Sequence, residues 1–240
     1  MSFLVFDIET CVDKALLRET RYRGQPISDA EAYDRFREEI QRDSDGRADF
    51  MPLSYQIPIS IVLGTVDPQY LLTGVDVLRA DELGTDAIVR SFWERLEGFD
   101  GTLVSFNGRG FDLPVLELYA LRAGLAAPRY FNDRDGFRAR HGRHFDLYDF
   151  LTNGGLSRLR GGFDLVSRLI GLPGKSEITG ADVQRLWDGG RFDEIHRYCR
   201  RDVIGTYYLL LHVERLRGTL SLEIVRQLED QTRTFRAELL

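Results

Sequence analysis

The chain has 240 residues, enough for one large domain with a full hydrophobic core and only marginally enough for two. Hydrophobic residues make up 43% and charged residues 29%, as in ordinary globular proteins, and no apolar run approaches the length of a membrane span. The net charge of -6 argues against a protein that coats duplex nucleic acid through bulk electrostatics, but it is compatible with an enzyme that binds a few phosphates locally.

The N-terminal residues lack the basic and apolar segments of a signal peptide, so we expect a cytoplasmic protein that does not associate with membranes. Cys11 and Cys199 are the two cysteines, and they form no CxxC pair. The sequence therefore supports neither a disulfide framework nor a zinc site, and both thiols are expected to be free and reduced.

An unbroken apolar run from Phe3 to Phe6 predicts a buried central strand, and two acidic residues, Asp7 and Glu9, follow at once. Side chains alternate along a strand, so these two carboxylates would point to the same face. Two buried carboxylates repel each other and are costly to desolvate, and a bound divalent cation would compensate both. The alternative is that the strand ends at Asp7, which leaves Glu9 and Thr10 in a solvated loop.

A densely charged insertion, residues 13–49, comes next. Ser28 is a predicted N-cap, and Glu31 would complete a capping box. We predict a loop and one amphipathic helix, inserted between strands and largely solvated. The apolar side chains at helical spacing are Tyr33, Phe36 and Ile40.

The middle of the chain predicts a mixed sheet with helices packed on it. Two β-branched, apolar segments separated by Asp67-Pro68-Gln69 indicate an antiparallel hairpin. The predicted elements are strands at 57–66 and 70–77, a helix at 80–97 with Gly98 after its end, and a buried strand at 103–106.

The predicted strand at 103–106 runs into the sequence NGRGFD, residues 107–112, and a helix is predicted from 113 to 125. The glycines allow a sharp turn and a close approach of backbone to a ligand. Asp112 is thereby placed beside the carboxyl end of a strand, where α/β sheets place their sites. Its carboxylate would be either a site residue or an ordinary helix cap.

Residues 134–144 are the one locally basic run, with four arginines and two histidines. These arginines would either contact phosphate or lie in a solvated loop. Residues 145–151 are predicted to be extended before turning into a helix. Asp146 in this segment would be a further metal ligand, or else a supporting or capping group.

The rest of the chain is predicted to be helical, at 161–170, 179–187, from about 193, and in two final helices. The turn GLPGK, residues 171–175, lacks the spacing of a P-loop, so its Lys175 is a surface lysine or a charge delivered to a phosphate. In the helix from 193, Tyr198 and Asp202 lie four apart on one face. Gly205 leaves space near Asp202, as expected where something packs closely.

Three motifs in this order resemble those of the DEDD 3'-to-5' exonucleases. The closest resemblance is to bacterial stand-alone proteins similar to the proofreading exonuclease domain of family B DNA polymerases, as in the segments FNGRGFDLP, GLPGK and YCRRDV. The resemblance extends from Phe3 to about Leu211 and is weakest in residues 13–49. The three motifs are Asp7-x-Glu9 on the first strand, Asn107-x-x-x-Phe111-Asp112 at a strand–helix junction, and Tyr198-x-x-x-Asp202 on a late helix.

The family divides by whether histidine or tyrosine precedes the last aspartate. The histidine type would need His five residues before Asp202, where Arg197 stands, and His196 misses that position by one residue. The resemblance therefore implies the tyrosine type. Tyr198 would orient the attacking water, because a phenol with a pKa of about 10 is protonated at neutral pH and is a poor general base.

The resemblance implies an α/β fold of the ribonuclease H-like type, a mixed central β-sheet flanked by α-helices, as a single exonuclease domain over residues 1–240. Four carboxylates at one site would be neutralised by two divalent cations, Mg²⁺ or Mn²⁺, which as hard ions prefer oxygen ligands. The implied metal ligands are Asp7, Glu9, Asp112 and Asp202, and the implied substrate contacts are Asn107, Phe111, Lys175 and Arg109.

The expected function is metal-dependent 3'-to-5' hydrolysis of single-stranded nucleic acid from its 3' ends by a two-metal-ion mechanism, with DNA favoured over RNA, in DNA repair. One alternative is a structure-specific endonuclease of the same fold, which the tyrosine on the last motif disfavours. Another is an inactive module that binds nucleic acid, which would be expected to have lost at least one of the four acids. We expect no polymerase segment in the chain, so proofreading would need a separate partner.

Overall fold

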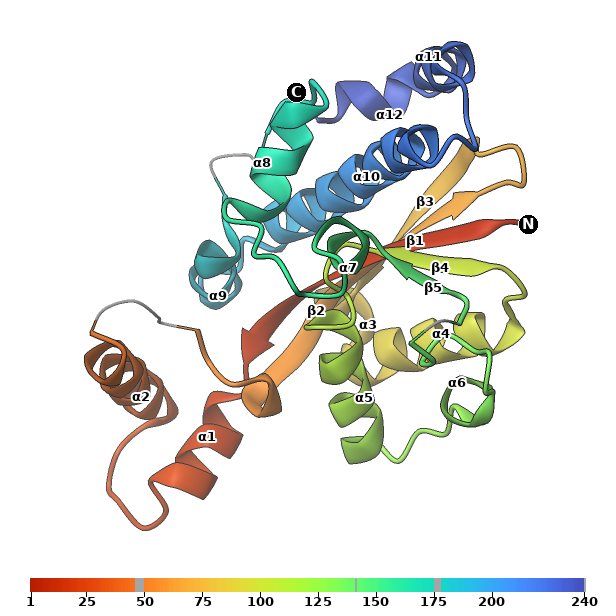
Figure 1. The fold of residues 1–240 in the computed structure, drawn as a ribbon. Helices are drawn as coiled ribbons and strands as arrows, with labels where there is room; N and C mark the ends of the chain where they lie inside the picture. Colours follow the sequence, from red (N-terminus) through yellow and green to blue (C-terminus); the bar gives the residue numbers. More distant parts are fainter. Residues whose placement is uncertain (46–49, 141, 175–177, 240) are drawn as a thin grey trace.

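The computed structural model describes residues 1–45, 50–140, 142–174 and 178–239 (Figure 1). Its five strands form one mixed sheet in the order β3-β2-β1-β4-β5, with helices packed against both faces. The expected mixed sheet flanked by helices is therefore confirmed. The strands are β1 (Phe3–Val12), β2 (Gln56–Val66), β3 (Leu72–Arg79), β4 (Thr102–Ser105) and β5 (His144–Asp146).

Helix α10 (Phe192–Leu216) packs along one face of the sheet, while α4 (Thr85–Gly98) and α5 (Asp112–Arg122) cover the other face (Figure 1). No helix in the described part of the chain is long and apolar enough to cross a membrane. The shorter helices are α1 (Lys14–Arg21), α2 (Asp29–Asp43), α3 (Ala80–Leu83), α6 (Pro128–Asn132), α7 (Leu147–Leu151), α8 (Gly162–Leu169), α9 (Gly180–Asp188), α11 (Leu222–Gln231) and α12 (Arg233–Ala237), and a 3-10 turn (Leu53–Tyr55) precedes β2.

Strand β1 is the centre of the sheet and is buried on both faces. It pairs antiparallel with β2 along its length and parallel with β4 through its first residues. Phe3 and Val5 face the core around α10, whereas Leu4 and Phe6 face the core around α4 and α5. Burial on both sides explains why the strand is apolar without alternation.

The alternative in which the first strand ends at Asp7 is wrong. The ladder to β2 continues through Asp7, opposite Val62, and Glu9, opposite Ser60, and a bulge interrupts it only after Glu9. Both acids therefore belong to a regular strand, and their side chains share the face that packs against α10.

The single helix predicted over residues 80–97 is wrong, because Gly84 divides it into α3 and α4. Gly84 has a φ of +83°, a left-handed conformation that ends one helix and that side chains other than glycine rarely adopt. The apolar periodicity that suggested a helix starts only at Ile88, inside α4.

The charged insertion contains two helices, α1 and α2, and not the one expected. The predicted capping box is present, since the Ser28 hydroxyl accepts from the Glu31 N–H and the Glu31 carboxylate accepts from the Ser28 N–H. Helix α1 is capped by Asp13, whose carboxylate accepts from the Leu16 N–H at 3.0 Å. Residues 46–49 of the predicted insertion lie outside the described residues. The insertion is less solvated than expected, because four of its side chains are buried in a small core with Val12 of β1 and Met51. These four are Leu17, Tyr22, Ala32 and Phe36.

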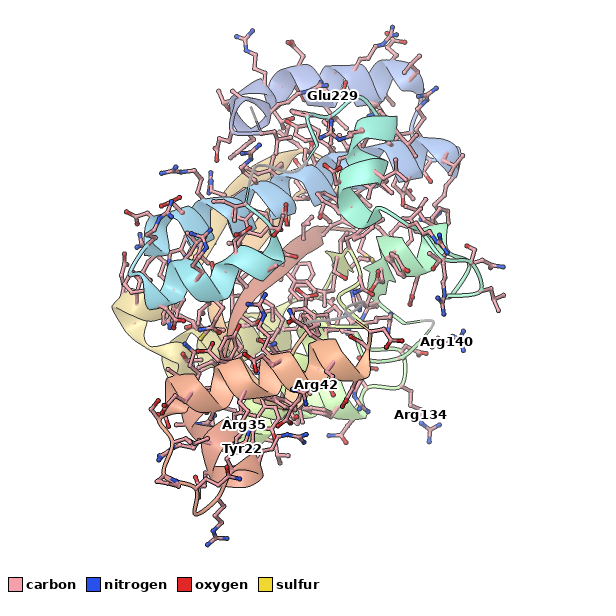
Figure 2. The ribbon with its side chains drawn as sticks, turned by 90° about the vertical axis from the view of Figure 1, so that its left-hand side faces the viewer. Tyr22, Arg35, Arg42, Arg134, Arg140 and Glu229 are labelled. Atoms are coloured by element: carbon pink, nitrogen blue, oxygen red, sulfur yellow. The ribbon has the colours of Figure 1, made fainter. Side chains whose placement is uncertain are left out.

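Helix α2 lies across the side of the molecule that also carries α8 and α9 (Figure 2). On it, the Arg35 guanidinium lies over the ring of Tyr22, 5.2 Å from its centroid. Arg21 and Tyr22 both donate to the Glu39 carboxylate, which joins α1 to α2. These contacts give the insertion a defined shape beside the sheet.

Candidate active site

Four carboxylates from three distant stretches of the chain meet where β1, α5 and α10 come together. The pKa of Asp7 is raised well above its usual range by burial, and then by the charges of Asp112, Asp202 and Glu9. Each of the other three acids is therefore close enough to repel a charge on Asp7. The fold brings together all four residues that the sequence motifs picked out.

Asp112 is the first residue of α5, and its carboxylate does not cap that helix in the usual way. The N-cap position is Phe111, which makes no side-chain capping bond. Instead, the Asp112 Oδ1 accepts from the Ile8 N–H at 3.1 Å, which ties the start of α5 to β1. Burial, together with the charges of Asp146 and Asp202, raises the pKa of Asp112 to about 7. The structure thus favours a site residue over an ordinary cap.

Cys199 was not predicted to take part in the site, yet its thiol is buried against it. The Cys199 Sγ donates to the main-chain oxygen and to the Oδ2 of Asp7, both at 3.5 Å. Burial and the charges of Asp7 and Glu9 raise the pKa of this thiol well above its usual value. It is a neutral donor that holds Asp7 in place. The expectation of two free cysteines is confirmed. The sequence signal for a role of Cys199 in the site was its position between Tyr198 and Asp202.

The donor atoms fit a hard divalent cation. Ligand atoms of Asp7, Glu9 and Cys199 lie within 4.8 Å of one another. Because a protonated thiol is a poor ligand for Mg²⁺ or Mn²⁺, the carboxylates are the ligands of choice in this cluster. Their buried and mutually repelling charges are what a bound cation would compensate.

Tyr198 lies on α10 one turn before Asp202 and is only 4% exposed. Its pKa is raised above the usual range by burial, by the charges of Asp202 and Glu9, and by a hydrogen bond to Asp202. Tyr198 and Asp202 line a cavity of about 30 Å³, which is the space of a single water molecule. Ser167 of α8 lines the same cavity, and its hydroxyl is buried with no hydrogen-bond partner in the described part of the chain.

The packing expected near Gly205 is present, and the neighbour is the ring of Phe163 from α8. A Cβ added to Gly205 would lie 2.8 Å from the Phe163 Cζ. Phe163 also lines a larger pocket of about 310 Å³, together with Asp7, Asn107 and Asp202. The glycine therefore lets α8 place an aromatic ring against the carboxylates.

We expect Gly205→Ala to lower stability by up to about 2 kcal/mol and to weaken activity. The helix gains about 1 kcal/mol in propensity, but displacing Phe163 costs about 1 to 3 kcal/mol. Chemical denaturation measures the change. Gly98→Ala is the matched control, because a Cβ there has open space in α4. Equal stabilisation of both variants would contradict the close packing of Phe163.

Asn107 and the glycine after it shape the turn between β4 and α5. Asn107 has a φ of +67° and is exposed toward the 310 Å³ pocket. A Cβ on Gly108 would lie 2.4 Å from the Ser105 Oγ, so the close approach that requires glycine is to Ser105. The approach of this backbone to a ligand stays a prediction.

Asp146 supports the turn and caps α7. Its carboxylate accepts from the N–H groups of Asn107 at 2.8 Å, Arg109 at 2.9 Å and Tyr148 at 3.0 Å. With both oxygens occupied by backbone donors, Asp146 fits the supporting and capping alternative and not that of a further metal ligand.

Two of the other predicted substrate contacts, Arg109 and Phe111, make contacts within the protein, and the third, Lys175, is not described. The Arg109 guanidinium donates to the main-chain oxygens of Ala139 and His144, at 3.1 and 3.0 Å, and so fixes the loop between α6 and β5. Phe111 is half-buried and packs edge-on against the exposed ring of Phe50, at 5.6 Å between centroids. Lys175 lies outside the described residues.

The basic run is divided between internal ion pairs and solvent. Arg143 pairs with Asp100 at 2.7 Å, and Arg138 pairs with Glu117 at 3.2 Å. Arg134 and Arg140 point outward from the edge of the molecule (Figure 2). His144 is buried, which lowers its pKa well below the usual value, so it is neutral. These observations favour the loop alternative over phosphate contact.

His196, which misses the histidine-type position by one residue, bonds to residues of β2 and α3. Its Nδ1 lies 2.8 Å from the Ser60 Oγ, and its Nε2 lies 2.7 Å from an Asp81 oxygen. Burial lowers its pKa in spite of the bond to Asp81. It is a neutral, structural histidine that joins α10 to β2 and α3.

Residues 48–238 match the family described as "Predicted 3'-5' exonuclease related to the exonuclease domain of PolB". The matched range includes Asn107, Asp112, Tyr198 and Asp202, whereas Asp7 and Glu9 precede it. None of the curated protein sequences matches the chain.

Among solved structures, the chain is similar to the family B DNA polymerase of the archaeon Pyrobaculum calidifontis, with 20% identity and a TM-score of 0.56 over 90% of this chain and 24% of the polymerase. It is also similar to E. coli exonuclease I in complex with a dT13 oligonucleotide, with 12% identity and a TM-score of 0.41 over 89% of this chain and 41% of that one. The zinc-bound complex of E. coli exonuclease I with single-stranded DNA gives 12% identity and a TM-score of 0.43 over 91% and 42%.

The chain thus spans about a quarter of the polymerase and about two fifths of exonuclease I. The likeness to the polymerase concerns the fold, and it confirms the expected ribonuclease H-like arrangement of sheet and helices. Because the matched range covers most of the sequence, this chain belongs to the family of predicted 3'-5' exonucleases related to the exonuclease domain of PolB.

Proposed function

We propose that this protein hydrolyses single-stranded DNA from its 3' end in a reaction that requires two divalent cations, Mg²⁺ or Mn²⁺. The observation that carries the proposal is the convergence of four carboxylates, in which Asp112, Asp202 and Glu9 all raise the pKa of Asp7. The relation of the family to the exonuclease domain of a DNA polymerase supports DNA over RNA as the substrate.

Asp7, Glu9, Asp112 and Asp202 would hold the cations. Bound there, the cations would polarise the scissile phosphate and lower the pKa of the attacking water. The thiol of Cys199 restrains Asp7 through its two contacts at 3.5 Å, and the Ile8 N–H restrains Asp112. These restraints place the oxygens before substrate arrives, which reduces reorganisation during the reaction.

Tyr198 would position the attacking water. Its phenol is neutral and so is not a base. Its one proton lies in the hydrogen bond to Asp202, so its oxygen would accept a hydrogen bond from the water. The cavity beside it offers two further contacts, the Asp202 carboxylate and the Ser167 hydroxyl, which has no hydrogen-bond partner among the described residues. A water held in a polar cavity commonly makes about three such hydrogen bonds.

The terminal nucleotide would occupy the 310 Å³ pocket that opens onto Asp7 and Asp202. Asn107 is exposed at its edge and would donate to the substrate, and Phe163 supplies an apolar surface. Phe111 and Lys175 remain predicted substrate contacts, whereas Arg109 acts through the loop that it fixes.

Digestion of a 5'-labelled single strand with and without Mn²⁺ tests the proposal. We expect a ladder that shortens one nucleotide at a time from the 3' end, absent in EDTA and absent on circular single-stranded DNA. Discrete internal cuts would instead indicate the endonuclease alternative. Retarded migration without cleavage would indicate the inactive binding module.

Metal binding is expected to stabilise the fold, because only a cation relieves the repulsion among the four acids. Free metal at a hundred times its dissociation constant should add about 2.7 kcal/mol to the free energy of unfolding. The melting temperature in EDTA is compared with that in millimolar Mn²⁺. Equal values would count heavily against a four-carboxylate metal site.

A further inference from the structure

A groove of about 720 Å³ lies between α8, the turn after it, and α12. Among the described residues, its lining carries three arginines, Arg168, Arg233 and Arg236, and no acidic residue. In a chain with a net charge of -6, this gathering of positive charge is unusual. Helix α8 and the C-terminal end of the described chain lie close together on the same side of α10 (Figure 1).

The charges of these arginines are weakly held by the protein itself. Arg168 pairs with Asp164 at 3.2 Å, and both side chains are exposed. Arg236 pairs with Glu229 at the longer distance of 3.4 Å. Arg233 is exposed and makes no ion pair with any residue between 1 and 239 that the structure describes. An exposed pair such as Arg168–Asp164 contributes about 0 to 1 kcal/mol, so an incoming phosphate can replace its carboxylate.

The groove lies next to the proposed catalytic site. Leu172 and Pro173 line both the groove and the one-water cavity beside Tyr198 and Asp202. The groove and the cavity therefore adjoin each other at these two residues. A strand with its 3' end at the carboxylates must lead the rest of its phosphates away over a neighbouring surface, and this groove is a neighbouring surface that carries positive charge.

We propose that this groove binds the sugar-phosphate backbone of the single strand, on the 5' side of the nucleotide at the carboxylates. The proposal rests on the proposed function and adds to it the path of the strand. Arginine suits this task because its planar guanidinium matches a phosphate with two parallel hydrogen bonds. Contacts to phosphate position a strand without selecting its sequence, so binding here is independent of base.

The test is the salt dependence of binding to a fluorescent oligothymidylate in EDTA, where the metal-dependent reaction is off. For a single strand, removing one arginine that binds a phosphate should reduce the slope of log K against log salt by about 0.7. We expect Arg233→Ala and Arg168→Ala each to lower the slope by about that amount, and the double variant by about twice as much. Arg233→Lys should keep the slope.

Arg90→Ala is the matched control, because Arg90 is exposed on α4 at the opposite face of the sheet and makes no ion pair within the described ranges. It should leave the slope unchanged. All variants should have the melting temperature of the wild type, because the substituted side chains are exposed. An unchanged slope in the Arg168 and Arg233 variants would overturn the proposal.

A second substrate separates failure of the groove from failure of the proposed function. The p-nitrophenyl ester of thymidine 5'-monophosphate has no upstream phosphates, so only the catalytic site acts on it. With Mn²⁺, we expect wild type and Arg233→Ala to cleave this ester equally, while kcat/KM for the oligonucleotide falls in the variant. Absence of both activities in the wild type would reject the proposed function, and the binding slope would still decide the groove.

Discussion

Asp112→Asn is expected to abolish cleavage of a single strand while leaving the fold intact. The amide is nearly isosteric, and its oxygen can keep the hydrogen bond from the Ile8 N–H that joins α5 to β1. It is, however, a poor ligand for a hard cation and removes one of four ligand charges. The measurement is single-turnover cleavage with saturating Mn²⁺, with stability followed in parallel.

The same variant should be more stable than the wild type when metal is absent. The pKa of Asp112 is about 7 in the folded protein against an ordinary value of 3.8, so its folded pKa is raised. The stability that protonated Asp112 contributes is complete below the ordinary pKa of 3.8 and is lost as pH rises through the folded pKa of about 7. The advantage of Asp112→Asn should therefore grow between about pH 4 and pH 7 and then level off, at a magnitude on the order of 4 kcal/mol.

Comparison of the two proteins in EDTA across pH isolates this effect. The pKa values of His144 and His196 are lowered, so protonation of these histidines reduces the free energy of unfolding as pH falls. This reduction is the same in both proteins. Glu223→Gln is the control, since Glu223 is an exposed acid in the first turn of α11. It should change neither rate nor pH dependence. Retained cleavage in Asp112→Asn would show that Asp112 is not a catalytic residue. A stability difference between the two proteins that does not change with pH would show that Asp112 does not titrate as part of the buried cluster.

Tyr198→Phe is expected to slow cleavage by on the order of 10² to 10⁴ with little change in metal affinity. The ring keeps its packing and all four carboxylates stay, but the hydroxyl beside the one-water cavity is removed. Because burial and neighbouring acids raise the pKa of this phenol, the wild-type rate should show no limb that depends on tyrosine ionisation. The measurement is single-turnover cleavage across pH, wild type against variant.

Tyr208→Phe is the matched control on the same helix. Tyr208 is fully buried, and its hydroxyl donates to the Thr232 main-chain oxygen at 2.9 Å, remote from the carboxylates. It should lose about 1 kcal/mol of stability and cleave at the wild-type rate. Wild-type rates in Tyr198→Phe would show that the spacing of Tyr198 and Asp202 reflects packing alone. A rate that rose toward the phenol pKa only in the wild type would instead make Tyr198 a general base.

Local patterns in the sequence determined most of the elements around the site. The apolar run before Asp7 predicted the central strand, and the two-residue spacing to Glu9 predicted a shared face. The four-residue spacing of Tyr198 and Asp202 placed both on one face of a late helix. These predictions succeeded because strand and helix periods are properties of neighbouring residues. The resemblance to an exonuclease family rested on the same spacings.

The interruption of the predicted helix at Gly84 and the extra helix α1 were missed for a local reason. Dense charge hid the weak apolar pattern of α1, which is anchored through a cap from Asp13. Gly84 stood inside a run that looked helical, and its positive φ separates α3 from α4. Propensity alone does not distinguish a tolerated glycine from one that ends a helix.

Only the tertiary structure decided how the site is assembled. The Cys199 thiol contacts Asp7 across 192 residues of chain, and the Ile8 N–H bonds Asp112 across 104. Ser167 reaches the cavity beside Tyr198 from a third element, α8, and Asp146 turns out to support the Asn107 turn. Desolvation and repulsion, which raise the pKa of Asp112 to about 7, depend on which groups are brought together and how deeply they are buried. The spacing of residues along the chain does not predict which distant groups come together or how deeply they are buried, because tertiary packing sets both.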